Sequence, residues 1–116
     1  MLNKRVLIDN CVPRRFKRYV THDDVTHVSE IGWEALDDPD LLKAAEGVYG
    51  ILISGDKNLP HQNRLSDYEI GVIILRVPSN SLQSFLPLAD DVNGVINNIK
   101  PRETRILFAP NYQPRR

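Results

Sequence analysis

The sequence predicts a single α/β domain with a mainly parallel central sheet of about four to five strands and helices on both faces. Short runs of consecutive apolar residues recur along the chain, and such runs are typical of strands that are covered on both faces. Segments with helical spacing separate these runs, which favours a parallel sheet. The length of 116 residues fits one domain. We place this domain at residues 1–108 and a polar, proline-containing tail at 109–116.

The first part of the chain predicts two strands joined by a short helix. Residues 4–9 (KRVLID) contain consecutive apolar residues and are expected to form a central strand. Residues 12–20 (VPRRFKRYV) are expected to form a short helix that opens at Pro13, where a missing N–H group costs nothing. Residues 24–32 (DVTHVSEIG) are expected to form the second strand.

The middle of the chain contains the clearest helix signal. In residues 37–47 (DDPDLLKAAEG), Asp38 is a natural N-cap, Pro39 occupies the first helical position, and Gly47 can close the helix. Residues 50–56 (GILISGD) follow as another apolar strand, and this strand also runs into an aspartate. The order of strand, helix and strand is that of a parallel crossover unit.

The last part of the chain repeats the alternation. Residues 71–77 (GVIILRV) are expected to form the fourth strand. Residues 79–99 have apolar side chains at helical spacing, and we expect Pro87 to kink this helix or divide it in two. Residues 104–108 (TRILF) are expected to form a late strand.

The composition restricts the class of partner. Fifteen basic residues balance fifteen acidic ones, so any contact with nucleic acid or membrane has to depend on local patches. The single cysteine cannot form an internal disulfide, which fits a reducing cytoplasm. No apolar run approaches the roughly 20 residues of a membrane span, and the first residues lack a signal-peptide pattern. We therefore expect a cytoplasmic protein with no membrane partner.

Three aspartates lie at the ends of predicted elements. Asp9 and Asp56 follow strands, and Asp38 lies at a helix start. The carboxyl ends of the strands carry the ligand site in open parallel sheets. Carboxylates within about 5 Å repel by roughly 3 kcal/mol per pair at an effective dielectric constant near 20. A divalent cation relieves this repulsion, and Mg²⁺ prefers such oxygen ligands. The pattern therefore favours a metal site that activates a bound water.

Each aspartate also has a purely structural interpretation. Asp38 can act only as a helix cap. Asp56 can be a turn residue within SGDKNLP. Asp9 can cap the helix that begins at Pro13. The sequence leaves both interpretations open.

The basic segment RRFKR places Arg14, Lys17 and Arg18 on one helix face. This face can bind a phosphate backbone, or it can be a solvated helix surface. Both interpretations remain open. Cys11 has no evident catalytic partner in the sequence.

Five stretches occur in an order that resembles a known family. They are LIDNCVP, THDDVTHVSEIGW, DDPDLL, ISGDKNL and GVIILRVPSN, and together they cover roughly residues 5–100. This ordered set resembles the compact PIN-like proteins of prokaryotes, which are short relatives of the PIN-domain ribonucleases of toxin–antitoxin systems. The resemblance implies a PIN-like sandwich.

The resemblance also implies a set of site residues. It assigns Asp9, Asp38 and Asp56 to a catalytic centre that holds Mg²⁺ or Mn²⁺, with the hydroxyl of Ser54 beside it. The positions that support this centre are Asn10, Asn58, Arg76 and Asn80. The implied activity is that of a metal-dependent endoribonuclease, the toxin of a toxin–antitoxin pair. The implied partners are RNA, a cognate antitoxin protein and a second copy of the chain.

The chain departs from the family pattern at two positions. Asn10 and Asn58 stand where the family often has acidic residues. Amides offer oxygen ligands without charge. A catalytically weak or inactive PIN-like binding protein is therefore the alternative to a nuclease.

A more distant alternative is a phosphoacceptor receiver-like signalling domain. Asp9 with Asn10, the stretch DKNLP from Asp56, and the KP pair at 100–101 imitate such a domain. Only fourteen residues separate Asp56 from Gly71, however, and this is too short for a full helix with both its connections. A receiver would also place Ser or Thr where this chain has Arg76.

Overall fold

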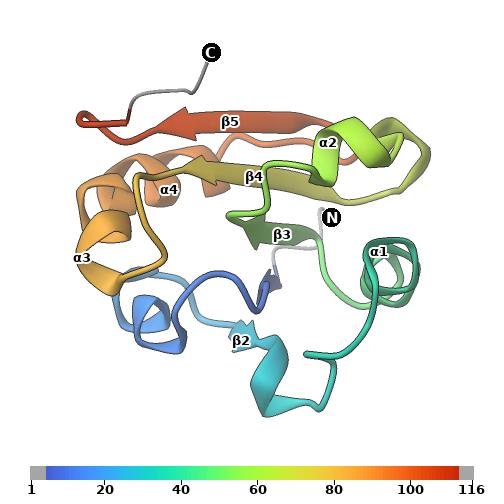
Figure 1. Ribbon diagram of the computed structural model, residues 1–116. Helices are drawn as coiled ribbons and strands as arrows, with labels where there is room; N and C mark the ends of the chain where they lie inside the picture. Colours follow the sequence, from blue (N-terminus) through green and yellow to red (C-terminus); the bar gives the residue numbers. More distant parts are fainter. Residues whose placement is uncertain (1–4, 113–116) are drawn as a thin grey trace.

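Five parallel strands form one sheet in the computed structural model, which describes residues 5–112 (Figure 1). The strand order is β2-β1-β3-β4-β5, and every neighbouring pair is parallel. The strands are β1 (Val6–Ile8), β2 (Val25–His27), β3 (Ile51–Ser54), β4 (Gly71–Arg76) and β5 (Thr104–Phe108). The α/β class, the parallel sheet and the number of strands that the sequence predicts are confirmed.

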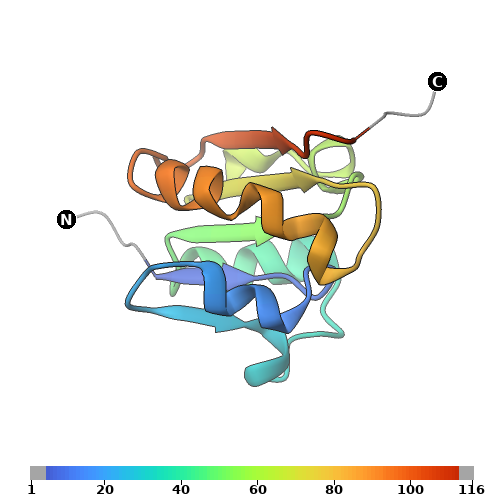
Figure 2. The ribbon, with the colours of Figure 1, turned by 90° about the vertical axis from the view of Figure 1, so that its left-hand side faces the viewer.

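Helices cover both faces of this sheet, as the sequence predicts. Figure 1 shows α3 and α4 on one side and α1 and α2 on the other, and Figure 2 looks onto the side of α3 and α4. The α-helices are α1 (Asp38–Glu46), α2 (Leu59–Gln62), α3 (Leu82–Phe85) and α4 (Ala89–Ile96). The 3₁₀-helices are η1 (Arg14–Tyr19), η2 (Val28–Glu30), η3 (Leu65–Asp67) and η4 (Leu86–Leu88).

Two separate hydrophobic cores result from this arrangement. Along β1, Val6 and Ile8 join the core beneath η1, α3 and α4, whereas Leu7 joins the core beneath α1 and α2. Successive side chains of a strand point to opposite faces, so both faces need apolar residues. This requirement explains why the central strands read as uninterrupted apolar runs.

One predicted helix differs from the sequence prediction in type, and one predicted strand is much shorter than expected. The predicted helix at 12–20 is the 3₁₀-helix η1. The predicted strand at 24–32 ends at His27, because the Glu30 carboxylate accepts a hydrogen bond from the His27 backbone N–H at 2.8 Å and turns the chain into η2. The helical region 79–99 is divided around Pro87 into α3, η4 and α4, as expected.

The stretch between β3 and β4 contains two short elements that the sequence analysis did not predict. These are α2 and η3, and each buries one leucine, Leu59 and Leu65 respectively. No helix within residues 5–112 combines the length and apolar character needed to cross a bilayer.

The start of α1 differs from the prediction by one residue. The N-cap is Asp37, whose side chain accepts a hydrogen bond from the backbone N–H of Asp40 at 3.0 Å. Asp38 is the first helical residue, and Pro39 follows it. The prediction that Asp38 caps the helix is therefore wrong, and its carboxylate is not engaged by the helix cap.

The cap assignment predicts a difference between two adjacent aspartates. Asp37→Ala should lower the free energy of unfolding by about 1 kcal/mol, because it removes the acceptor for an unpaired helix N–H. Asp38→Ala should not produce this loss. Urea denaturation of both variants measures the difference. An equal loss in the two variants would assign the cap to both residues and contradict the structure.

Candidate active site at the carboxyl edge of the sheet

The strand order creates a crevice beside β1. The chain leaves β1 for β2 on one side, and it returns to place β3 on the other side. In open parallel sheets, ligands bind outside the carboxyl ends of the strands at such a change of direction. Asp9 directly follows β1, and Asp56 comes two residues after the end of β3. Both aspartates therefore lie where the topology favours a ligand.

A hollow of about 480 Å³ occupies this position. Its lining includes all three aspartates that the sequence analysis assigned to a site. The full lining is Asp9, Asn10, Cys11, Asp38, Gly55, Asp56, Lys57, Asn58 and Asn80. The structure thus brings Asp9, Asp38 and Asp56 together with the three asparagines that were expected to support them. We refer to this hollow as the carboxylate hollow.

Ser54 connects the ends of β1 and β3. Its side chain is fully buried. Its hydroxyl donates a hydrogen bond to Oδ2 of Asp9 at 2.8 Å and accepts one from the backbone N–H of Asp56 at 3.1 Å. One hydroxyl therefore fixes the orientation of the Asp9 carboxylate and the start of the loop that carries Asp56.

Asp9 and Asp56 each use one carboxylate oxygen in a local turn. Oδ1 of Asp9 accepts a hydrogen bond from the Asn10 N–H at 2.7 Å, and Oδ1 of Asp56 accepts one from the Asn58 N–H at 2.9 Å. The turn interpretation is therefore correct for one oxygen of the Asp56 side chain. Asp9 does not cap the helix after it, since η1 has no side-chain cap.

Asp38 experiences the negative charge of its neighbours. Partial burial raises the pKa of its carboxyl group, and the charges of Asp56 and Asp9 raise it further. A hydrogen bond between the side chains of Asp38 and Asp56 acts in the same direction, whereas a hydrogen bond with Asn63 opposes it. The three carboxylates are therefore close enough to repel, and protonation relieves this repulsion when no cation is present.

The donors in the carboxylate hollow restrict how a divalent cation could be held. No three His, Cys, Asp or Glu side chains within residues 5–112 are arranged to hold a metal ion. Mg²⁺ commonly binds proteins through only one or two carboxylates, and it completes its shell with waters and substrate phosphates. Asp38 and Asp56 line the same hollow and can supply such a donor set, and Asp9 adds charge beside them.

Cys11 also lines the carboxylate hollow, although no pattern in the sequence marks it as a site residue. Its sulfur is 3.4 Å from the Ser54 hydroxyl and accepts a hydrogen bond from the Gly55 N–H at 3.1 Å. Burial, followed by the charge of Asp9, raises the pKa of the thiol to about 11. The thiol is therefore neutral at physiological pH and is not an activated nucleophile.

Four residues that were expected to contribute to function lie away from the carboxylate hollow. Arg76 lines an adjoining hollow. Arg14, Lys17 and Arg18 line a third hollow together with Arg15 and Glu30. There the Nζ atom of Lys17 lies 3.0 Å from Oε1 of Glu30, and Nη2 of Arg14 lies 3.7 Å from Oε2. Glu30 thus neutralises part of the basic cluster.

Comparison with protein-family models, curated proteins and solved structures finds no match to this chain. The resemblance to PIN-like proteins therefore depends on the ordered motifs of the sequence alone.

The pKa of Asp38 predicts how pH affects stability. A raised pKa in the folded state means that the charge on Asp38 costs stability above its ordinary pKa of 3.8, and that this cost disappears as the pH falls toward that value. Asp38→Asn should therefore stabilise the metal-free protein at pH 7, and the gain should vanish on acidification.

Asp40→Asn is the matched control. Both substitutions remove a carboxylate from the first turn of α1 and lose the same favourable interaction with the helix dipole. Thermal melts in EDTA across pH 3–8 compare the two variants. If Asp38→Asn is no more stable than Asp40→Asn at pH 7, the repulsion at the site is absent.

Proposed function

We propose that the protein is a Mg²⁺- or Mn²⁺-dependent nuclease of PIN-like type that hydrolyses RNA phosphodiester bonds. The observation that carries the proposal is the convergence of Asp9, Asp38 and Asp56 on one hollow, where partial burial and then the charges of Asp56 and Asp9 raise the pKa of Asp38. A structural role alone does not require three carboxylates to be gathered at the change of strand direction. Unrelieved negative charge at such a position is what a cation site needs.

The residues of the chain have separate tasks in this proposal. Asp38 and Asp56 would hold the ion, and Ser54 keeps the carboxylate of Asp9 oriented beside them. The ion, when bound, supplies a water of lowered pKa and countercharge for the phosphoryl oxygens. Lys57 is exposed at the wall of the hollow, where its ammonium group can pair with a substrate phosphate.

The toxin role and the antitoxin partner extend this proposal on the strength of the motif resemblance. A catalytically inactive PIN-like binding protein is the alternative that Asn10 and Asn58 support, because their amides add no charge to the site. Metal binding distinguishes the nuclease from the inactive binding protein, because only the nuclease needs a metal ion.

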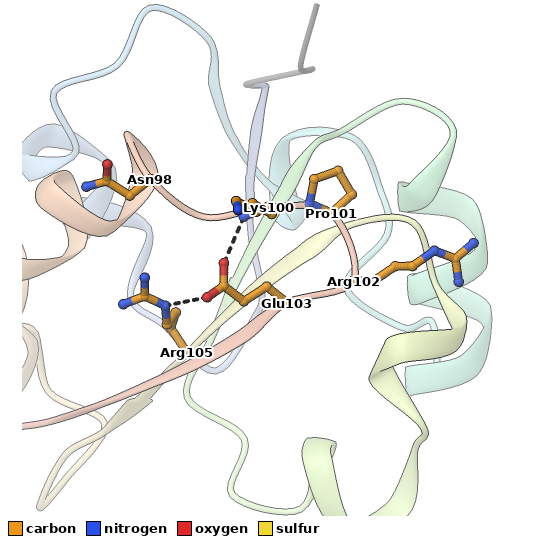
Figure 3. A pocket seen from close by; sticks show the side chains of 6 residues that line it. All are labelled: Asn98, Lys100, Pro101, Arg102, Glu103 and Arg105. Carbon is orange, nitrogen blue, oxygen red and sulfur yellow. Dashed lines mark hydrogen bonds and ion pairs between the residues drawn. The ribbon is translucent and has the colours of Figure 1, made fainter.

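The strand order favours a second candidate function, that of a phosphoacceptor receiver domain, because receiver domains share the order 2-1-3-4-5. Other features count against a receiver. Lys100 and Pro101 lie in the loop before β5, at the amino edge of the sheet, where the Lys100 backbone N–H donates to Glu103 at 2.9 Å (Figure 3). The phosphoacceptor candidate Asp56 lies at the opposite, carboxyl edge. These lysine and aspartate residues therefore belong to different ends of the domain.

Metal binding should stabilise the protein. Millimolar Mg²⁺ or Mn²⁺ should raise the melting temperature, because a ligand that binds only the folded state stabilises it by about 2.7 kcal/mol at a hundred times its dissociation constant. Asp38→Asn should weaken this effect, and Asp40→Asn should preserve it. An unchanged melting temperature in either ion, together with a flat calorimetric titration, would remove the metal from the proposal.

Asp9→Asn separates catalysis from folding. The amide keeps an oxygen that can accept the hydrogen bond from Asn10, but it removes one negative charge. We expect RNA cleavage to be abolished while the fold is retained. Cleavage of a labelled RNA and circular dichroism measure the two properties. A folded variant that cleaves RNA at the wild-type rate would contradict the role of Asp9.

A further inference from the structure

A second hollow of about 400 Å³ adjoins the carboxylate hollow along β5. The two hollows share Lys57 and Asn58. Its lining combines basic and apolar side chains and, within residues 5–112, includes no Asp or Glu. The lining is Lys57, Asn58, His61, Arg76, Ile106, Phe108 and Tyr112. We refer to it as the β5 hollow. Its composition is opposite in charge to that of the carboxylate hollow beside it.

Arg76 is the most informative residue of the β5 hollow. It lies at the carboxyl end of β4 and is only 9% exposed. Leu75 and Val77 point into the core beneath α3 and α4, so Arg76 points to the other face, between α2 and β5. No group within residues 5–112 makes a hydrogen bond or an ion pair with its guanidinium.

No buried side-chain nitrogen or oxygen within residues 5–112 lacks a hydrogen-bond partner, so the unpartnered guanidinium of Arg76 reaches the solvent of the β5 hollow while the rest of its side chain is buried. The five N–H donors of arginine match the oxygens of a phosphate or a carboxylate. The position of Arg76 therefore indicates an anion that enters the β5 hollow from outside the chain.

Aromatic rings form the outer wall of the same hollow. Phe108 on the edge strand β5 is 60% exposed, and its ring centroid lies 5.7 Å from that of Tyr112. The Nζ atom of Lys57 lies 5.5 Å from the ring centroid of Tyr112. Exposed rings beside cations are the features on which proteins stack the bases of single-stranded nucleic acid.

We propose that the β5 hollow binds one nucleotide of single-stranded RNA next to the phosphodiester that enters the carboxylate hollow. The base stacks on Phe108, and the phosphate pairs with Arg76 and Lys57. The choice of RNA rests on the proposed function. An apolar protein partner would cover Phe108 but would leave the guanidinium of Arg76 unpaired. A duplex would fit poorly, because its bases are stacked inside the helix and do not reach Phe108.

The experiment measures binding without cleavage. Fluorescence anisotropy in EDTA compares a labelled single-stranded oligoribonucleotide with the same sequence in a duplex. We expect the single strand to bind more tightly, and Phe108→Ala to weaken its binding by about five-fold or more, which is the scale of losing one stacked base. Phe108→Trp should retain binding, because it keeps an aromatic face. Ile31→Ala, at another exposed apolar side chain, is the control.

Arg76→Gln tests the phosphate contact. It should weaken binding and reduce the slope of log affinity against log salt by about one, as the loss of one phosphate contact does. Arg105→Gln is the matched control, since Arg105 lies on β5 but pairs with Glu103 at 2.7 Å. If Arg76→Gln does not fold, the Phe108 variants still test the proposal, because Phe108 is largely exposed.

Three results would overturn this inference. They are equal affinity for single strand and duplex, wild-type binding by Phe108→Ala, and a dimer in sedimentation that Phe108→Ala abolishes. The last result would assign the surface to a second copy of the chain. Because binding is measured without metal, loss of the proposed nuclease activity would leave this result unaffected, and the two failures are distinguishable.

Discussion

The position of β1 between β2 and β3 is the constraint on which the carboxyl edge of the sheet depends. The register pairs Ile8 with Ile53, and the Asp9 N–H donates to the Ile53 carbonyl at 2.8 Å. Asp9 follows Ile8 and Ser54 follows Ile53, so these two polar residues are neighbours across the strands. The Ser54 hydroxyl donates a hydrogen bond to the Asp9 carboxylate. Strand pairing alone thus places side chains that are 45 residues apart in the sequence within hydrogen-bonding distance.

The sequence predicts most of the fold because its signal is local. Consecutive apolar residues identify the strands, and aspartates at strand ends identify two of the three carboxylates in the hollow. The sequence does not show which of Asp37 and Asp38 caps α1, because that depends on which carboxylate reaches the Asp40 N–H. It also does not reveal the place of Cys11, whose contact with Ser54 exists only after β1 and β3 have paired.

A net charge of zero conceals a local separation of charge. Acidic groups collect in the carboxylate hollow, and cationic groups line the β5 hollow beside it. Lys57 and Asn58 form the boundary between them. In the proposed function, this division places countercharge for a phosphate chain next to the carboxylates that hold the ion. Composition averages over both surfaces and therefore cannot show either of them.

The two adjacent aspartates at the start of α1 have a consequence for how the protein can evolve. Asp37 holds the helix, whereas the carboxylate of Asp38 faces the other acids. In the proposed function, a substitution at position 38 would therefore remove metal binding while the chain still folds. If the proposed activity is present, a lineage of such proteins can lose it by drift and keep an intact scaffold, on which selection can then establish a binding role.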